Sequence, residues 1–374
     1  MNVHWKVVFE MPLPLGNTMR EVLVARGGAV SAASGLGRAH HDLIKALDAG
    51  IIKGYASGGV IEHDLGGNPA TRLNRRWRSN PARVKRSLSM MDMLHISDQE
   101  QAHLVPENCP IPVSITVHDL FNIHPRKVSG VEIGENNPGP VRRKDLNKLR
   151  AGLQRADLLI CDSKATLKEV EEYYPDIAAV CVPLGLELEA RNPESNPLNP
   201  PPWILDESKK HLLLVGSEEP RKRLDFAIQS CKGLTDVVLH KIGAESNSER
   251  ERYLKALAST HRIDLRWQGR VPEDDLRAAF QHADALLFPS IAEGFGYPPL
   301  EAMAGGTRTL VANAASANEI PPESHLLPVD DLQAWKKAIM GLQPGRCQES
   351  IKRAEMFSAD VFAKNMSNAW DSLF

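Results

Sequence analysis

Short apolar runs rich in β-branched residues alternate with helical patterns along nearly the whole chain. Parallel strands need crossover connections, which are usually helices, so this alternation is typical of α/β folds built on parallel sheets. The strands are expected at 3–10, 21–25, 92–97, 112–117, 157–162, 179–183, 211–216, 236–243, 265–269, 284–290 and 309–313. The helices between them are expected at 35–50, 163–174, 222–233 and 272–283, with another opened by Pro298 and Pro299.

The chain divides most naturally into two domains, because 374 residues exceed what one ordinary core holds. The polar, proline-rich stretch 191–203 is the best candidate for a linker. We therefore expect an N-terminal domain over 1–190 and a C-terminal domain over 203–356. The amphipathic segment 357–374 is expected to form a last helix that docks on either domain, including a crossing back to the first.

Composition excludes several classes of protein. A formal charge of −2 argues against a general electrostatic nucleic-acid binder, and no apolar run has the length of a membrane span. The charged and polar residues within the first apolar run argue against a signal peptide. Five scattered cysteines without a C-x-x-C pair favour reduced thiols over a disulfide framework or a zinc site. The expectation is a cytoplasmic protein.

The stretch "PSIAEGFGYPPLEAMAGGT" (289–307) carries the strongest functional signal. Gly294 and Gly296 let a ligand approach the backbone, and the following helix offers free N–H groups to an anion. Glu293 and Glu301 flank this turn, and carboxylates accept hydrogen bonds from hydroxyl groups. A carboxylate, an anion site and a second carboxylate, in this order, suit a ligand made of a sugar, a diphosphate and a ribose. The alternative is an exposed loop with a solvated glutamate.

A second signal lies in "LLLVGSEEPRKRLDFAI" (212–228), where a strand ends at Gly216 and a helix follows. Arg221 and Lys222 are adjacent cations at this junction and suit a diphosphate, the arginine by its fork and the lysine as a point charge. The alternative is a solvated basic turn beside Glu218 and Glu219.

The pattern E-G-F-G-x-P-x-L-E-A-M-A-x-G resembles the E-x7-E signature of family 4 retaining glycosyltransferases. The resemblance is tight over 211–320 and looser before it. It implies the GT-B architecture, in which two Rossmann-like domains face a cleft. It also implies that Glu293 contacts hydroxyls of the donor sugar and Glu301 the nucleotide ribose. Backbone groups of Gly294, Phe295 and Gly296 would serve the same donor.

The resemblance carries over to further positions. It places Lys222 and Arg221 on the donor pyrophosphate, although Ser217 stands where many members have an arginine. His118, in "SITVHDLFNIHP", would lie against the donor sugar, with Asp119 either bonded to it or beginning a turn. The remaining carried positions are Gly216 beside the cations, Gly269 and Val271 at the base pocket, and Gly35 and Gly37 in a phosphate-facing loop with Arg38 as a further candidate.

The implied activity is retaining transfer of a hexose from a nucleotide-diphosphate sugar, without a general base or a resident cofactor. The chain has no D-x-D triplet, which favours a metal-independent site. The resemblance to bacterial mannosyltransferases favours GDP-mannose and a glycan or polyisoprenyl-diphosphate-linked acceptor in cell-surface polysaccharide synthesis. The alternatives are a UDP-sugar donor, a UDP-sugar epimerase and a non-catalytic scaffold subunit.

The stretch 72–86, "RLNRRWRSNPARVKR", holds seven basic residues, no acidic ones, and Trp77. Such a segment suits anionic lipid headgroups on the inner face of the membrane or a lipid-linked diphosphate. A solvated loop is an equal alternative. Nucleic acid is not expected, because no recognisable binding module accompanies the stretch.

Overall fold

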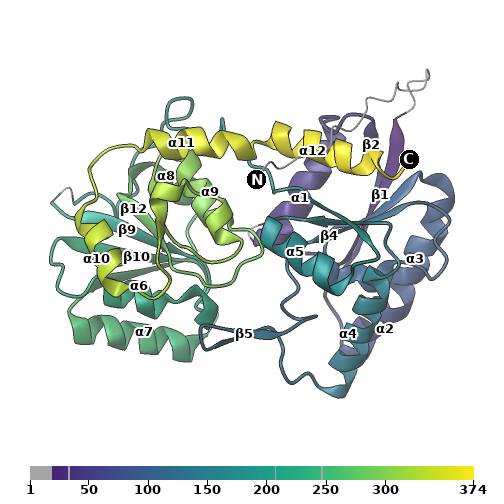
Figure 1. Ribbon diagram of the computed structural model, residues 1–374, viewed down its shortest axis with the longest axis horizontal. Helices are drawn as coiled ribbons and strands as arrows, with labels where there is room; N and C mark the ends of the chain where they lie inside the picture. Colours follow the sequence, from purple (N-terminus) through teal and green to yellow (C-terminus); the bar gives the residue numbers. More distant parts are fainter. Residues whose placement is uncertain (1–18, 33, 207, 246) are drawn as a thin grey trace, which may run out of the picture.

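The fold was analysed in a computed structural model, which describes residues 19–374 apart from 33, 207 and 246. Two six-stranded sheets, both entirely parallel, form two domains that lie side by side (Figure 1). The α/β fold class expected from the alternating pattern is thus confirmed. The strand expected at 3–10 lies outside the described residues.

The first sheet has the order β2-β1-β3-β4-β7-β8. Its strands are β1 (Arg20–Gly28), β2 (Tyr55–His63), β3 (Met93–Ile96), β4 (Val113–Val117), β7 (Leu158–Cys161) and β8 (Ala178–Cys181). Successive side chains of a strand point to opposite faces. Val22 and Val24 therefore pack with α1 (Gly35–Asp48), whereas Leu23 and Ala25 pack with α3 (Asn80–Ser87) and α4 (Pro140–Leu153). Helix α5 (Lys164–Tyr173) joins the second of these two layers.

The second sheet has the order β11-β10-β9-β12-β13-β14. Its strands are β9 (Lys210–Val215), β10 (Val237–Ile242), β11 (Asp264–Gly269), β12 (Ala285–Phe288), β13 (Arg308–Ala312) and β14 (Leu326–Leu327). One face is covered by α6 (Leu224–Ser230), α7 (Ser248–His261) and α10 (Leu332–Met340). The other face is covered by α8 (Glu273–His282) and α9 (Tyr297–Ala304), and α11 (Gln348–Ala354) lies beyond α9.

A short antiparallel hairpin, β5 (Arg126–Val128) and β6 (Val131–Ile133), extends from the N-terminal domain toward the other one (Figure 1). Ser129 and Gly130 both have positive φ at its turn, which suits the twist of a two-residue hairpin. Its residues pack with Phe121 and with Ala292 of the C-terminal domain. The hairpin therefore bridges the two domains beside the start of the 293–296 turn.

The last helix, α12 (Ala359–Asp371), returns from the C-terminal domain to the N-terminal one (Figure 1). Trp370 is fully buried and donates its indole N–H to Ser114 Oγ at 3.0 Å. The hydroxyl of Tyr55 donates to Asp371 at 2.9 Å. The chain thus crosses between the domains twice, once through the segment 184–204 and once before α12.

The proline-rich segment 191–203 has no regular secondary structure, yet it lies against the C-terminal domain. Gln281 of α8 accepts from the backbone N–H of Leu198 and donates to the carbonyls of Arg191 and Asn196. These three bonds hold the backbone of the linker against α8 and fix the position of Arg191.

The basic stretch 72–86 is helical, so a loop conformation, one of the two alternatives considered for it, does not occur there. It forms α2 (Pro69–Asn74), one π-helical turn (Arg75–Ser79) and α3. Asn68 caps the first of these helices by accepting from the N–H of Thr71, and Pro69 and Pro81 both occupy first-turn positions, where a proline costs no hydrogen bond. Among the described residues, no helix has the length and apolar character needed to cross a bilayer.

Candidate active site

A cavity of about 550 Å³ lies between the two domains, at the carboxyl ends of β4 and β9. Ligands of open α/β sheets bind at this edge, because the loops there face away from the packed helices. Both sheets supply lining residues, so neither domain forms the site alone. The sequence-predicted residues that line it are Gly35, His118, Gly216, Arg221, Lys222, Val271, Glu293, Gly294, Phe295, Gly296 and Glu301.

Glu293 lies between the two predicted cations. Lys222 Nζ is 2.5 Å from its Oε1, and Arg221 Nη1 is 2.8 Å from its Oε2. Ser290 donates a third hydrogen bond to the same carboxylate at 2.5 Å. Burial alone would raise the pKa of Glu293, but Lys222 and Arg221 outweigh burial and lower it to about 2. The carboxylate is therefore ionised and holds both cations at the cavity wall.

The cations are placed by the turn after β9. Gly216 has a φ of +129°, a conformation that glycine adopts without strain, and residues 220–222 then form one 3₁₀ turn. The backbone carbonyl of Arg221 accepts from the N–H of Ile291, so this turn is bonded to the segment that follows β12. The expected junction of strand, turn and helix is present, with Arg221 and Lys222 on its cavity side.

The turn 293–296 needs its two glycines for different reasons. A Cβ on Gly294 would lie 2.2 Å from the carbonyl oxygen of His118, so this position lets the two domains approach closely. Gly296 has a φ of +130° and forms the N-cap of α9. Phe295 is buried with Tyr297 and anchors the turn in the core shared by both domains. Pro298 and Pro299 have no N–H, so Gly296 and Tyr297 supply the backbone N–H groups at the N-terminus of α9, beside the cavity, where they suit an anion.

Glu301 is paired with arginines from outside its own helix. It forms an ion pair with Arg38 of α1 and a second one with Arg191 of the linker, whose Nη1 lies 3.2 Å from Oε1. The guanidinium of Arg38 also lies 5.4 Å from the ring centre of Tyr297. Glu301 is 4% exposed, so these arginines supply the positive charge that its burial requires.

His118 lines the cavity but both of its ring nitrogens have partners. Nδ1 lies 2.5 Å from Asp162 Oδ2, and Nε2 lies 3.1 Å from the carbonyl oxygen of Ser97, which can only accept. Burial would lower the pKa of His118, but Asp162 outweighs it and raises the pKa to about 9. The partner of His118 is therefore Asp162, whereas Asp119 begins a turn by accepting from the N–H of Phe121.

Asp119 also lines the cavity. Burial raises its pKa to about 6, against the opposing effects of the Phe121 N–H, His118 and Arg221. Asp119 is half-buried, and its exposed part opens onto the cavity. A carboxyl with this pKa changes charge close to neutral pH, which gives the site a titratable group besides its two glutamates.

Two predicted glycines are not among the described residues that line the cavity. Gly37 lies one turn into α1, where a Cβ would clash with the carbonyl of Ser31. Gly269 ends β11 with a φ of +68° and directs the next residues, Arg270 and Val271, toward the cavity. Both glycines therefore shape the lining indirectly.

Two partners of the site were not identified from the sequence. Arg191 lies in a linker of irregular conformation, and the partner of His118 lies 44 residues away. A signal for Asp162 did exist, because it directly follows a buried strand that pairs with the strand before His118. The hairpin at 126–133 had a weaker signal in its Ser-Gly turn.

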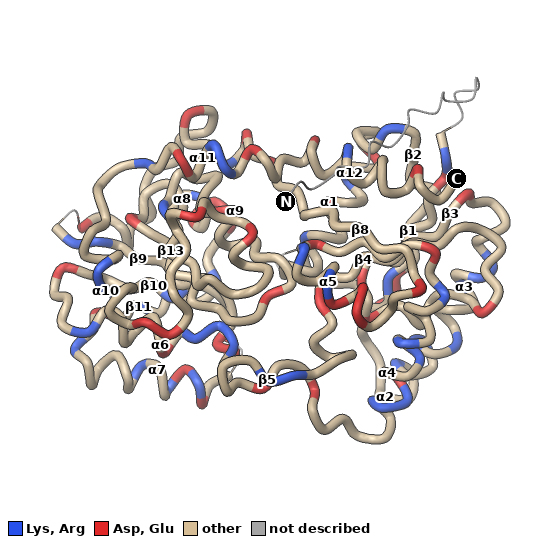
Figure 2. The backbone as a smooth tube through the Cα atoms, in the orientation of Figure 1, with Lys and Arg blue, Asp and Glu red and all other residues tan. Residues whose placement is uncertain are grey.

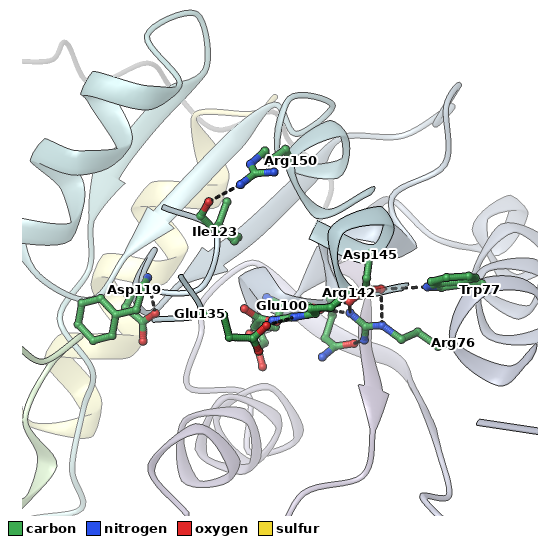
Figure 3. A network of polar contacts seen from close by, with 12 residues as sticks. Arg76, Trp77, Glu100, Asp119, Ile123, Glu135, Arg142, Asp145 and Arg150 are labelled. Atoms are coloured by element: carbon green, nitrogen blue, oxygen red, sulfur yellow. Dashed lines mark hydrogen bonds and ion pairs between the residues drawn. The ribbon is translucent and has the colours of Figure 1, made fainter. Parts of the chain in front are cut away.

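The basic stretch has a structural role in addition to any surface role. Lys and Arg positions gather around α2 and α4 at one end of the N-terminal domain (Figure 2). Arg76 binds both oxygens of Asp145 at 2.7 and 2.8 Å, and the indole of Trp77 donates to the same carboxylate (Figure 3). Arg142 adds a bond to Asp145 at 2.8 Å. Arg76 and Trp77 therefore connect the stretch to α4, whereas Arg72, Arg78 and Arg86 are exposed.

Comparison with known proteins agrees with this geometry. Residues 196–341 match the family described as "Glycosyl transferases group 1". The chain carries a glycosyltransferase group 1 domain. That domain contains both predicted cations and both predicted glutamates, and the two facing parallel-sheet domains give the chain the GT-B architecture.

Relatives and solved structures extend the comparison. The serotype-specific mannosyltransferase WbdA of Escherichia coli is 28% identical over 239 residues, which cover 60% of this chain and 28% of WbdA. This chain thus spans less than a third of that relative. Sucrose-phosphate synthase from Thermosynechococcus elongatus has a TM-score of 0.71 at 16% identity, covering 95% of this chain and 99% of that one. HepE of Anabaena, in complex with UDP, has a TM-score of 0.67 at 14% identity, covering 95% and 100%.

Proposed function

We propose that this protein is a retaining glycosyltransferase that moves a hexose from a nucleotide-diphosphate sugar to a glycan or lipid-linked acceptor. One observation carries the proposal. Lys222 and Arg221 converge on Glu293 beside the N–H groups that open α9, inside a cavity between two domains. Two cations and a helix N-terminus suit a diphosphate, and a neighbouring carboxylate suits the hydroxyls of the attached sugar.

The chemistry follows from where charge develops. Transfer breaks the anomeric C–O bond, and the departing diphosphate gains negative charge as the sugar gains oxocarbenium character. Lys222, Arg221 and the N–H groups of Gly296 and Tyr297 would stabilise that charge, and groups held in place before the reaction are most effective. Glu293 would orient the two cations and accept hydrogen bonds from the hydroxyls of the sugar. The departing phosphate would accept the proton of the acceptor, so no side chain is assigned as general base.

The favoured donor is GDP-mannose, and the favoured process is cell-surface polysaccharide synthesis. The name of the relative WbdA, a mannosyltransferase, supports the sugar. The complex of HepE with UDP supports a UDP-sugar as the second candidate, because that protein shares the fold. We propose transfer without a divalent metal, because the two cations can neutralise the diphosphate themselves. An epimerase or a scaffold subunit would also have this fold.

The proposal is tested by incubating the full chain with GDP-mannose, UDP-glucose, UDP-galactose and UDP-N-acetylglucosamine and measuring nucleoside diphosphate release. We expect release from one donor, with GDP-mannose first, at a rate that excess EDTA leaves within about twofold. Lys222→Ala is the matched control for contaminating hydrolases. Release from none of the donors, or equal release by the variant, would contradict the proposal. Conversion of a UDP-sugar to its epimer would favour the epimerase.

A further inference from the structure

A second cluster of reactive side chains lies outside the interdomain cavity, on the far side of α9. His325 ends the 3₁₀ turn Glu323–His325, Cys347 directly precedes α11, and Glu349 lies in the first turn of α11. One ligand-type atom from each residue lies within 4.8 Å of the others. Imidazole nitrogen, thiolate sulfur and carboxylate oxygen are the three donor types that zinc takes from proteins. None of the three residues lines the cavity described above.

The two separations from His325 fit a shared metal ion, although the one to Cys347 is also within the range of a hydrogen bond to sulfur. Cys347 Sγ lies 3.7 Å from His325 Nε2, and Glu349 Oε2 lies 3.8 Å from the same nitrogen. A tetrahedral zinc ion with ordinary bond lengths holds its sulfur, nitrogen and oxygen ligands roughly 3.4–3.6 Å apart. A nitrogen and an oxygen at 3.8 Å are too far apart for a good hydrogen bond. Both separations are therefore within a few tenths of an ångström of the edges of a zinc tetrahedron.

The surroundings orient the ligands as metal sites require. His325 Nδ1 lies 3.1 Å from Thr309 Oγ1, so a proton on Nδ1 can be donated there, with the Nε2 lone pair directed toward Cys347 and Glu349. Metal-binding histidines usually donate the other ring N–H in this way, which fixes the tautomer. Ser324 Oγ lies 2.9 and 3.0 Å from the oxygens of Glu349 and orients that carboxylate.

We propose that His325, Cys347 and Glu349 bind one zinc ion, with water as the fourth ligand. His325 and Cys347 are buried, and Glu349 is exposed, so the open position faces solvent. The backbone N–H of Cys347 donates to the carbonyl of Gly306, two residues after α9 ends. The ion would join the start of α11 to the turn Glu323–His325. It is separate from the metal-independent transfer proposed for the cavity.

Cobalt(II) titration of the full chain tests the site, because a thiolate bound to cobalt gives a charge-transfer band and tetrahedral cobalt gives strong visible absorption. We expect one cobalt per chain with both features, displaced by zinc. Glu349→Gln should weaken cobalt binding at least tenfold, and Cys347→Ser should remove the charge-transfer band. Glu355→Gln and Cys109→Ser are the matched controls and should bind like the wild type.

Glu349 is exposed, so its substitution is not expected to disturb folding, unlike that of the buried Cys347. Zinc should also raise the melting temperature of the wild type, and this increase should be lost in Glu349→Gln, because an ion that binds only the folded state stabilises it. Weakly absorbing octahedral cobalt without a charge-transfer band would overturn the proposal. Unchanged affinity in Glu349→Gln would overturn it as well.

Discussion

Arg38 and Glu301 form an ion pair across the interdomain cavity, between the first helix of one domain and α9 of the other. Arg191 of the linker binds the same carboxylate oxygen at 3.2 Å. The residue expected to bind a ribose thus has two cationic partners within the protein. A nucleotide that binds Glu301 must replace part of this pairing, which links donor binding to the contact between the domains.

The two glutamates should respond differently to substitution. Glu301→Gln should weaken binding of the bare nucleoside diphosphate about tenfold, because the ribose hydroxyls lose a charged acceptor. Glu293→Gln should bind the same diphosphate at least as tightly as the wild type, because Lys222 and Arg221 are then no longer neutralised by a protein carboxylate. Its sugar-dependent turnover should fall.

Calorimetry with the diphosphate, and then with the intact donor, separates the two cases. Glu273→Gln is a suitable control, because Glu273 is an exposed carboxylate that also contacts Arg38 and Arg191. If Glu293→Gln lost diphosphate affinity and Glu301→Gln kept it, the two roles would be assigned the wrong way round.

Lys222→Ala should lose most of its transfer activity and keep its fold. The ammonium group supplies a point charge at the proposed diphosphate site, and removal of one such group typically lowers the rate by a factor on the order of 10²–10³. Circular dichroism and the melting temperature would report the fold. Turnover at the wild-type rate would exclude Lys222 from the site.

Asp119→Asn should stabilise the protein at pH 8 and lose that advantage as the pH falls. The pKa of Asp119 is raised from 3.8 to about 6 in the folded state, so protonation stabilises the fold below pH 3.8 and this contribution is lost as the pH rises through 6. A shift of two units corresponds to about 3 kcal/mol, but the carboxyl opens onto a cavity, so we expect about 1 kcal/mol. Urea unfolding of the wild type and of Asp119→Asn at pH 8 and pH 5 measures this difference in the free energy of unfolding. An equal difference at both pH values would contradict the raised pKa of Asp119.

The exposed arginines of the basic stretch should determine any attachment to anionic lipid. Reversal of Arg72, Arg78 and Arg86 to Glu should release the protein from phosphatidylserine vesicles, since each basic residue near the surface contributes about 1 kcal/mol. High salt should have the same effect through screening. Arg76 is left unchanged because it binds Asp145.

Reversal of Arg252, Lys337 and Lys352, which are exposed on the C-terminal domain, is the matched control and should leave vesicle binding unchanged. If the wild type ignored anionic vesicles at low salt, the stretch would have no lipid role. A soluble acceptor would then be the better proposal.

Local sequence patterns predicted the parts of the fold that have a strong local signature. The buried strands appear in the sequence as apolar runs, and the turn 293–296 is indicated by its glycines. Strand β2 was not predicted, because Ser57, Gly58 and Gly59 interrupt its apolar pattern; it forms because its backbone pairs with β1. Helix α4 was also not predicted, because its first two turns are rich in charged residues.

Local sequence patterns could not predict contacts between side chains that are distant in the sequence. The pairs Arg38–Glu301 and Arg76–Asp145 join residues 263 and 69 positions apart. These pairs form only when the two domains, and the helices of the basic stretch, are packed together. The spacing of residues in the sequence does not predict that packing. The motif thus identified which residues line the cavity, whereas the structure identified the partners of those residues within the protein.

The central claim is that Lys222 and Arg221 bind a diphosphate, and it is tested most directly by comparing nucleotides that differ by one phosphate. Titrations of GDP against GMP, and of UDP against UMP, should be made with the wild type and with Lys222→Met, which keeps the length of the side chain. The account predicts that the wild type prefers a diphosphate to its monophosphate at least tenfold and that the variant loses most of this preference. Equal affinity of the wild type for both nucleotides, or an undiminished preference in Lys222→Met, would contradict it.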